Sequence, residues 1–365
     1  MRIQKVFVKW RRTMLTSKMI KQAALEAGAD LCGIGPMSRF KGAPDVMNPT
    51  FLFPHAKSCI ALAFRIPRGV QRGIEEGTQF YQYPSMAYGG INEIHAPAVL
   101  YHVGKVIEDE GYEAFVYRNT GGRGAVSDMD GSPGNNLTPE EEMKPKNNRT
   151  VKFTRAVEEG KQPPDLQFQF RLAAVACGLG EIGWSKMLLT PEFGPLQRVA
   201  FIFTDAELEY DEMYSGKPLC RKCGACVREC PGGCIPAINS GKTITVDLAG
   251  KKCEWGDIDM WRCFAFYTHG GRYYNPFVPK EVFDKNEDGM LDLLEGVTDV
   301  ANGDEVTKVY TALAKYFPSW VGYNMAKCGG CIRACVSMLE KKGGCMEGRF
   351  ENPLRRGTKT WKMDR

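Results

Sequence analysis

Apolar residues recur along the chain with two different periods, which together predict a mixed architecture of helices and strands. Some segments place an apolar residue every three or four positions, as amphipathic helices do, and others are short apolar runs typical of buried strands. The predicted helices cover residues 17–28, 95–110 and 167–177, and the predicted strands cover residues 29–35, 58–64, 112–117 and 198–204. Gly28 and Gly111 close the first two helices, and the first strand is expected to run into a glycine turn. The predicted fold class is therefore α/β, or α+β.

One long stretch interrupts this pattern. Residues 119–164 are rich in glycine, proline, asparagine and charged side chains, which predicts a long loop or lid. The chain has 365 residues, of which 43% are hydrophobic. It can therefore bury a substantial core, as two domains or as one large domain with an insertion.

The cysteines of the second half follow a spacing that indicates iron–sulfur chemistry. They form two groups: Cys220, Cys223, Cys226 and Cys230, which Pro231 follows, and then Cys328, Cys331 and Cys335. The first group has the spacing of bacterial ferredoxins, in which three cysteines bind one four-iron, four-sulfur cluster and the fourth binds a second cluster. We therefore expect two 4Fe-4S clusters.

The two clusters are expected to have separate sets of ligands. The first set is Cys220, Cys223, Cys226 and Cys335, and the second is Cys230, Cys328, Cys331 and one further cysteine. Either Cys263 or Cys253 can complete the second set. Cys263 is favoured because Trp261 and Phe264 would shield a cluster from water. Zinc fits this pattern less well, since zinc motifs rarely use three cysteines in a C-x-x-C-x-x-C run.

Charge and hydropathy limit the expected partners. The formal net charge is +5, and residues 355–365 are basic, which we interpret as a solvated tail rather than an RNA contact. The chain has no apolar run of about eighteen residues, so no membrane partner is expected. The pair Arg11 and Arg12 lacks the apolar stretch of an export signal, and a cytoplasmic protein is expected.

A second block of motifs resembles a known enzyme family. Residues 177–183 read Cys-Gly-Leu-Gly-Glu-Ile-Gly, residues 187–195 read Met-Leu-Leu-Thr-Pro-Glu-Phe-Gly-Pro, and residues 203–205 read Phe-Thr-Asp. Together with the paired cysteine motifs, this order resembles the corrinoid-dependent iron–sulfur reductases, which include epoxyqueuosine reductases and reductive dehalogenases. The resemblance extends over roughly residues 17–345.

The resemblance implies two fused domains. A nitroreductase-like domain over residues 13–215 would bind cobalamin and substrate, and residues 119–164 would be its lid. A ferredoxin-like domain over residues 216–345 would hold both clusters, with an insertion at 264–327, and residues 346–365 would form a basic tail. Electrons would pass from an external low-potential donor, a ferredoxin or flavodoxin, through the clusters to cobalt.

The resemblance also implies a cobalamin site. The expected binding residues are Gly178, Leu179, Gly180, Glu181, Gly183, Thr204 and Asp205. Glycines at such positions let the backbone approach a large planar ligand. None of the four histidines lies in an Asp-x-His-x-x-Gly motif, so cobalamin would be base-off, without a protein histidine on cobalt.

The proton donor implied by the resemblance lies just before the predicted helix 95–110. Tyr88 would donate a proton, with Arg171 and Asn119 as its helpers, because a nearby cation favours the tyrosinate. Epoxyqueuosine reductases use an aspartate instead. Asp165 is the nearest candidate, but its spacing to Cys177 departs from the family, which makes a tRNA substrate less expected.

The predicted insertion contains a further metal motif. Residues 284–295 match the calcium loop of an EF-hand at every ligand position, with Gly289 at position six and Glu295 at position twelve. A structural Ca²⁺ is one interpretation, and a solvated acidic loop is the other.

Three functions remain open from the sequence. The first is a corrinoid-dependent reductase that acts on a small organic substrate by reductive dehalogenation or a related reductive elimination. The second is an epoxyqueuosine reductase acting on tRNA. The third is a non-catalytic electron carrier or corrinoid activator.

Overall fold

The computed structural model describes residues 14–44, 47–119, 157–161, 168–259, 262–263, 266–267, 271–285, 289, 292, 329–357 and 360–364. Several predictions fall outside these residues. They concern most of the lid, most of the insertion and of the calcium loop, and the side chains of Asp165 and Cys328.

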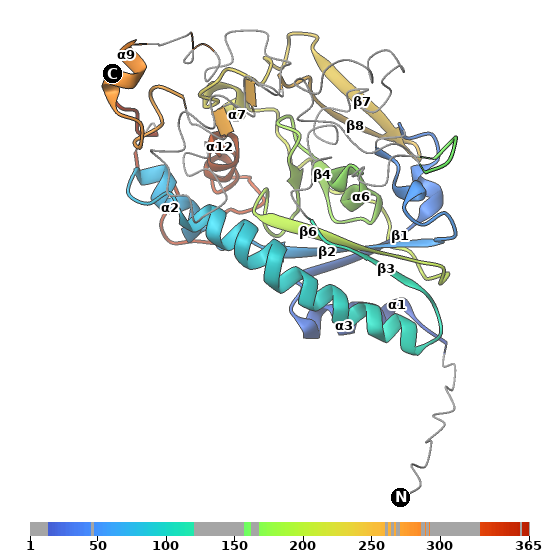
Figure 1. Ribbon diagram of the computed structural model, residues 1–365. Coiled ribbons are helices and arrows are strands. Elements are labelled where there is room, and N and C mark those ends of the chain that lie inside the picture. Colours follow the sequence, from blue (N-terminus) through green and yellow to red (C-terminus); the bar gives the residue numbers. More distant parts are fainter. Residues whose placement is uncertain are drawn as a thin grey trace, which may run out of the picture.

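A four-stranded antiparallel sheet lies at the centre of the first half of the chain (Figure 1). Its strands, in spatial order, are β1 (Leu31–Pro36), β2 (Ser58–Arg65), β6 (Gln197–Thr204) and β3 (Ala114–Tyr117). Leu31 pairs with Ala63, and Ser58 pairs with Thr204. The predicted mixture of helices and strands is confirmed, and the antiparallel pairing makes the sheet α+β in type.

Helices cover both faces of this sheet (Figure 1). One face carries α1 (Ser17–Ala27) and α3 (Ala96–Asp109), and the other carries α6 (Phe170–Ala176). Successive side chains of a strand point to opposite faces. Ile60 and Leu62 of β2 therefore enter the core beneath α1 and α3, while Cys59 and Ala61 enter the core beneath α6. Burial on both faces explains why these strands are continuous apolar runs in the sequence.

The ends of α1 are fixed by local hydrogen bonds. The Thr16 side chain accepts from the Met19 N–H at the start, and Gly28 ends the helix with φ 110°. The Gly28 N–H bonds to carbonyl oxygens of the last turn. The predicted helix over residues 17–28 is thus confirmed. It ends at Gly28 because glycine adopts the left-handed conformation without a steric penalty.

The predicted glycine turn after the first strand is wrong. Gly33 and Gly35 lie inside β1. A Cβ on Gly33 would lie 2.1 Å from the carbonyl oxygen of Cys177, and one on Gly35 would lie 2.5 Å from that of Ala176. Glycine is needed here because the end of α6 crosses the strand at contact distance.

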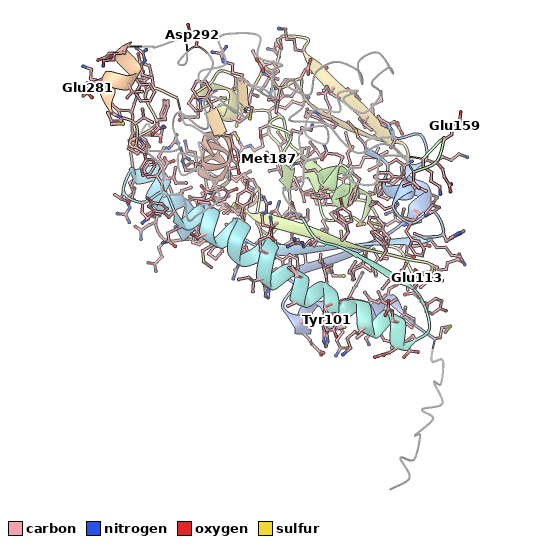
Figure 2. All side chains as sticks on the ribbon, viewed as in Figure 1. Tyr101, Glu113, Glu159, Met187, Glu281 and Asp292 are labelled. Atoms are coloured by element: carbon pink, nitrogen blue, oxygen red, sulfur yellow. The ribbon has the colours of Figure 1, made fainter. Side chains whose placement is uncertain are left out.

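The helix predicted to begin at His95 is preceded by further helical structure. A π-helix, η4 (Pro84–His95), leads directly into α3. π-Helices are rare and occur often at functional sites. Tyr101 of α3 is 68% exposed and points away from the sheet (Figure 2), whereas Tyr88 of η4 packs against the core.

The remaining elements are short. They are η1 (Met37–Phe40), η3 (Pro49–Phe51), α2 (Gly69–Glu76), β4 (Glu181–Ile182), β5 (Leu188–Leu189), α7 (Ala225–Arg228), β7 (Thr243–Leu248), β8 (Lys251–Gly256), α9 (Lys280–Lys285) and α12 (Gly330–Leu339). β4 pairs with β5, β7 pairs with β8, and α12 packs against α7. No helix in the described part of the chain is long and apolar enough to cross a membrane.

The C-terminal segment is docked on the protein, so the prediction of a solvated tail is wrong. Leu354 is fully buried, and its N–H donates to Oε2 of Glu340 at 2.8 Å. Arg355 forms ion pairs with Glu75 of α2 and with Glu229. The indole N–H of Trp361 donates to the carbonyl oxygen of Ile74 at 2.5 Å. Arg355 and Arg356 therefore meet acidic partners that lie far away in the sequence.

Candidate metal centre

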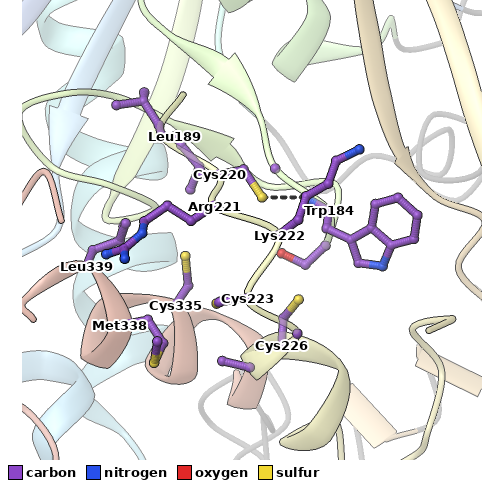
Figure 3. Close-up of a pocket in the computed structure, with 15 residues that line it drawn as sticks. Trp184, Leu189, Cys220, Arg221, Lys222, Cys223, Cys226, Cys335, Met338 and Leu339 are labelled. Carbon is purple, nitrogen blue, oxygen red and sulfur yellow. Dashed lines mark hydrogen bonds between the residues drawn. The ribbon is translucent and has the colours of Figure 1, made fainter. Parts of the chain in front are cut away.

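Four cysteines from two distant segments line one pocket in the second half (Figure 3). Cys220 and Cys223 come from the loop before α7, Cys226 comes from α7, and Cys335 comes from α12. The structure thus brings together the four thiols that the sequence assigns to the first cluster. Among the described residues, no three His, Cys, Asp or Glu side chains lie close enough to hold a single metal ion. A four-iron cluster instead spreads its thiolates around its corners, which suits a shared pocket.

The chemistry of these thiols fits an iron cluster. Burial raises the pKa of the Cys226 thiol to about 11, and the neighbouring Cys220 and Cys223 add to the shift. Burial also raises the pKa of Cys335, and the other three thiols of the pocket again contribute. Adjacent thiolates are therefore unfavourable in this pocket without positive charge among them, and iron would supply that charge.

The walls of the pocket hold Cys220 in place and are partly apolar. The Trp184 backbone N–H donates to Cys220 Sγ at 3.3 Å, and the Cys220 N–H donates to Glu181 Oε1 at 2.7 Å. Leu189, Met338 and Leu339 form apolar walls (Figure 3), and Leu219 also lines the pocket. Hydrogen bonds to a ligand sulfur and exclusion of water both change the reduction potential of a cluster.

A second group of thiols is centred on a cysteine that the motif did not include. The Cys234 thiol lies beside the thiols of Cys230 and Cys263, and its backbone N–H donates to Cys230 Sγ at 3.3 Å. The bond from Cys234 outweighs burial and lowers the pKa of Cys230 to about 6. Cys253, the competing candidate, lies in β8 within the core beneath α6. The structure therefore places Cys263, rather than Cys253, beside Cys230.

Cys234 could have been noticed in the sequence. It follows Cys230 by four positions, the same interval that separates Cys226 from Cys230 and Cys331 from Cys335. Cys331 lies in the first turn of α12, and Cys328 precedes the described part of that helix.

The glycines predicted to bind cobalamin have a structural explanation within the chain. A Cβ on Gly180 would lie 1.9 Å from the Leu189 carbonyl oxygen, and a Cβ on Gly178 would lie 2.5 Å from that of Glu212. A Cβ on Gly183 would lie 3.0 Å from Leu189 Cδ1. Close packing against backbone carbonyls therefore accounts for Gly178 and Gly180, whereas Gly183 meets only the end of a leucine side chain. The binding of cobalamin by all three glycines stays a prediction.

The other predicted cobalamin residues also have contacts within the chain. Leu179 is buried in the core beneath α6, and Glu181 bonds the Cys220 loop. Thr204 Oγ1 accepts from the Ala206 N–H at 3.2 Å, and Asp205 Oδ1 accepts from the Glu113 N–H at 2.8 Å. These last two residues close the end of β6.

Tyr88 lies in an aromatic group with a guanidinium over its ring. Its hydroxyl hydrogen-bonds with the hydroxyl of Tyr267, and Arg198 Cζ lies 4.4 Å from its ring centroid. The Tyr83 ring meets it edge-on at 6.0 Å. Burial raises the pKa of Tyr83, Tyr88 adds to the shift, and Arg198 opposes it.

The two predicted helpers of Tyr88 lie in different surroundings. The neighbouring Cys234 is the main cause that lowers the pKa of the Cys263 thiol, and the positive charge of Arg171 lowers it further. Asn119 is half-buried just after β3. Arg198, which the sequence reasoning missed, is a lone cation within the apolar strand β6.

Sequence comparisons agree with the resemblance seen in the motifs. No protein-family model matches the chain. The tetrachloroethene reductive dehalogenase of Desulfitobacterium hafniense (strain Y51) is 29% identical over 161 residues, which are 41% of this chain and 27% of the relative. That of Sulfurospirillum multivorans is 30% identical over 131 residues, 34% of this chain and 26% of the relative. The predicted resemblance to this reductase family is confirmed. The matched part spans about a quarter of the length of these relatives.

Solved structures of two kinds are similar to this chain. A catabolic reductive dehalogenase in complex with 3-bromo-4-hydroxybenzoic acid has a TM-score of 0.43 and 15% identity, and the match covers 68% of this chain and 28% of that one. Epoxyqueuosine reductase from Streptococcus thermophilus has a TM-score of 0.42 and 14% identity, with 93% and 86% covered.

Proposed function

We propose that the chain is a corrinoid-dependent iron–sulfur reductase that removes a leaving group from a small organic substrate, or carries out a related reductive elimination. The observation that carries this proposal is the pocket lined by Cys220, Cys223, Cys226 and Cys335. Thiols from two distant segments converge there as a cubane requires. The sequence similarity to tetrachloroethene reductive dehalogenases supports the same reaction class.

The residues that would hold the cofactors follow from the two thiol groups and the glycine block. The pocket thiols would hold one 4Fe-4S cluster in a ferredoxin-like part of the chain. Cys230 and Cys263, with Cys331 and Cys328, would hold the other. A nitroreductase-like part would bind base-off cobalamin. When bound, the clusters carry single electrons to the corrinoid, whose cobalt reduces the substrate.

The chain's own residues would orient the substrate's proton source. Tyr88 would donate the proton of its hydroxyl, and the hydrogen bond to Tyr267 orients that hydroxyl. Arg198 over the ring would stabilise the negative charge that remains after the transfer. Arg171 and Asn119 stay candidate helpers.

Electrons would enter at the first cluster. Cys223 is exposed, and so are Arg221 and Lys222 beside it (Figure 3). The Arg221 guanidinium also donates to the carbonyl oxygen of Lys342 at 3.3 Å, which brings a second exposed basic stretch to this rim. A positive rim would attract an acidic donor protein, as a ferredoxin or flavodoxin is expected to be.

The test is anaerobic purification after expression with iron and cobalamin. We expect about eight irons per chain, as two four-iron clusters require, and the absorption spectrum of a base-off corrinoid. Cys226→Ala should lower the iron content. A chain without iron would refute the proposal, and a chain with both clusters that binds no corrinoid would be an electron carrier. A gel shift with epoxyqueuosine tRNA, absent with unrelated RNA, would favour the tRNA substrate.

A further inference from the structure

The second thiol group has a fixed geometry around Cys234. Cys234 is 3% exposed, and its thiol lies beside the thiols of Cys230 and Cys263. Its backbone N–H also donates to Cys230 Sγ at 3.3 Å. A metal cluster bound by Cys230 and Cys263 must therefore lie against the sulfur of Cys234.

The loop between Cys230 and Cys234 has a conformation that brings these two cysteines together. Gly233 has φ 60°, and its N–H bonds to the Cys230 carbonyl oxygen at 3.1 Å, so the loop curls back on itself. A Cβ on Gly232 would lie 2.7 Å from Cys234 Sγ and 2.6 Å from the ring of Phe266. Glycine at this position leaves the space that the sulfur occupies.

Backbone hydrogen bonds tie Cys234 to the segment of Cys263. The Asp259 N–H donates to the Cys234 carbonyl oxygen at 3.0 Å, and the Cys263 N–H donates to the Asp259 carbonyl oxygen at 2.9 Å.

A Cβ on Gly330 would lie 2.8 Å from the Glu229 carbonyl oxygen. The first turn of α12, which carries Cys331, therefore abuts the segment that carries Cys230.

We infer that Cys234 is a reserve ligand of the second cluster, able to bind the iron that Cys230 binds. The inference rests on the proposed function. Cys234 belongs to the same short loop as Cys230, and its backbone N–H already contacts the Cys230 sulfur, so the two cysteines have the proximity that an exchange of ligands needs. In the exchange the bond from iron to Cys230 would break and one to Cys234 would form, the Cys234 thiol giving up its proton and the freed Cys230 thiolate taking one up.

The test compares single and double variants by iron content and electron paramagnetic resonance. Cys230→Ala should keep about eight irons and the signals of two four-iron clusters. Cys234→Ala should also keep both clusters, while the double variant Cys230→Ala/Cys234→Ala should lose the second. Cys226→Ala is the matched control in the first cluster, because the neighbouring thiols that line its pocket are already assigned as ligands, and it should lose iron.

Two results would overturn the inference. If Cys230→Ala alone loses the second cluster, Cys234 does not replace it. If Cys234→Ala alone loses the cluster, Cys234 is an obligatory ligand and not a reserve. Thermal unfolding of the iron-free variants is compared with that of iron-free wild type. Equal unfolding temperatures show that a variant without iron has lost its cluster and has not misfolded. Wild-type protein without iron would instead refute the proposed function itself.

Discussion

Replacing Glu75 with glutamine should strongly destabilise the protein. The Glu75 side chain is 3% exposed and contacts two guanidiniums, that of Arg333 at 2.8 Å and that of Arg355. Arg355 also pairs with Glu229 at 3.0 Å. Two carboxylates and two guanidiniums thus balance one another in a largely buried site, and Glu75→Gln leaves an excess positive charge.

The magnitude follows from the contacts. A hydrogen bond to a charged group contributes about 1.5–3 kcal/mol, and Glu75 accepts from both arginines. Removing one partner of a buried ion pair costs about 3–5 kcal/mol. Glutamine keeps a carbonyl oxygen that can accept one bond, so we expect a loss of about 3 kcal/mol in the free energy of unfolding, and about 4–5 kcal/mol for Glu75→Ala.

The assay is urea unfolding of wild type and variants at one pH and salt concentration. Glu76→Gln is the matched control, because Glu76 is the next residue of α2 and its pairs with Arg72 and Arg356 are more exposed. Exposed pairs contribute at most about 1 kcal/mol. Equal losses for Glu75→Gln and Glu76→Gln would refute the reasoning. Faster tryptic cleavage after Arg356 in Glu75→Gln would show that the C-terminal segment is released.

Three further predictions concern the proposed cofactors and donor. Glu181→Gln should raise the reduction potential of the first cluster, because it removes a negative charge bonded to the Cys220 loop; an unchanged midpoint in a redox titration would contradict this. Tyr88→Phe should lower turnover by about 10²-fold or more with iron and corrinoid content unchanged, as expected for loss of a general acid; full activity would assign the proton to another group. Arg221→Glu with Lys222→Glu should raise the KM for an acidic donor and flatten its dependence on ionic strength; a KM equal to wild type at low salt would place donor binding elsewhere.

The sequence predicted features that depend on local spacing. The helix that Gly28 ends and the strand 58–64 follow from apolar periodicity and a glycine cap, and both are present. The four pocket thiols follow from the ferredoxin spacing, since a tight loop can present three of them. Placing Cys335 in the same pocket required one long-range contact between the two cysteine motifs, and the second motif predicted that contact.

Features that depend on distant partners could not be predicted. One acidic partner of Arg355 is Glu75, 280 residues away in sequence, so the segment looked like a solvated tail. Gly33 and Gly35 looked like a turn because the carbonyl oxygens that exclude a Cβ belong to α6. The π-helix η4 was missed because its period differs from that of an α-helix.

Cys331 and Cys335 stand one turn apart on α12, one for each predicted cluster. Four residues of an α-helix rise about 6 Å, so this helix would set the distance between the two proposed clusters. Its length cannot change without unwinding the helix. Motions of the loops around the proposed clusters would then alter when an electron arrives from the donor, but not the rate of its transfer between the two clusters.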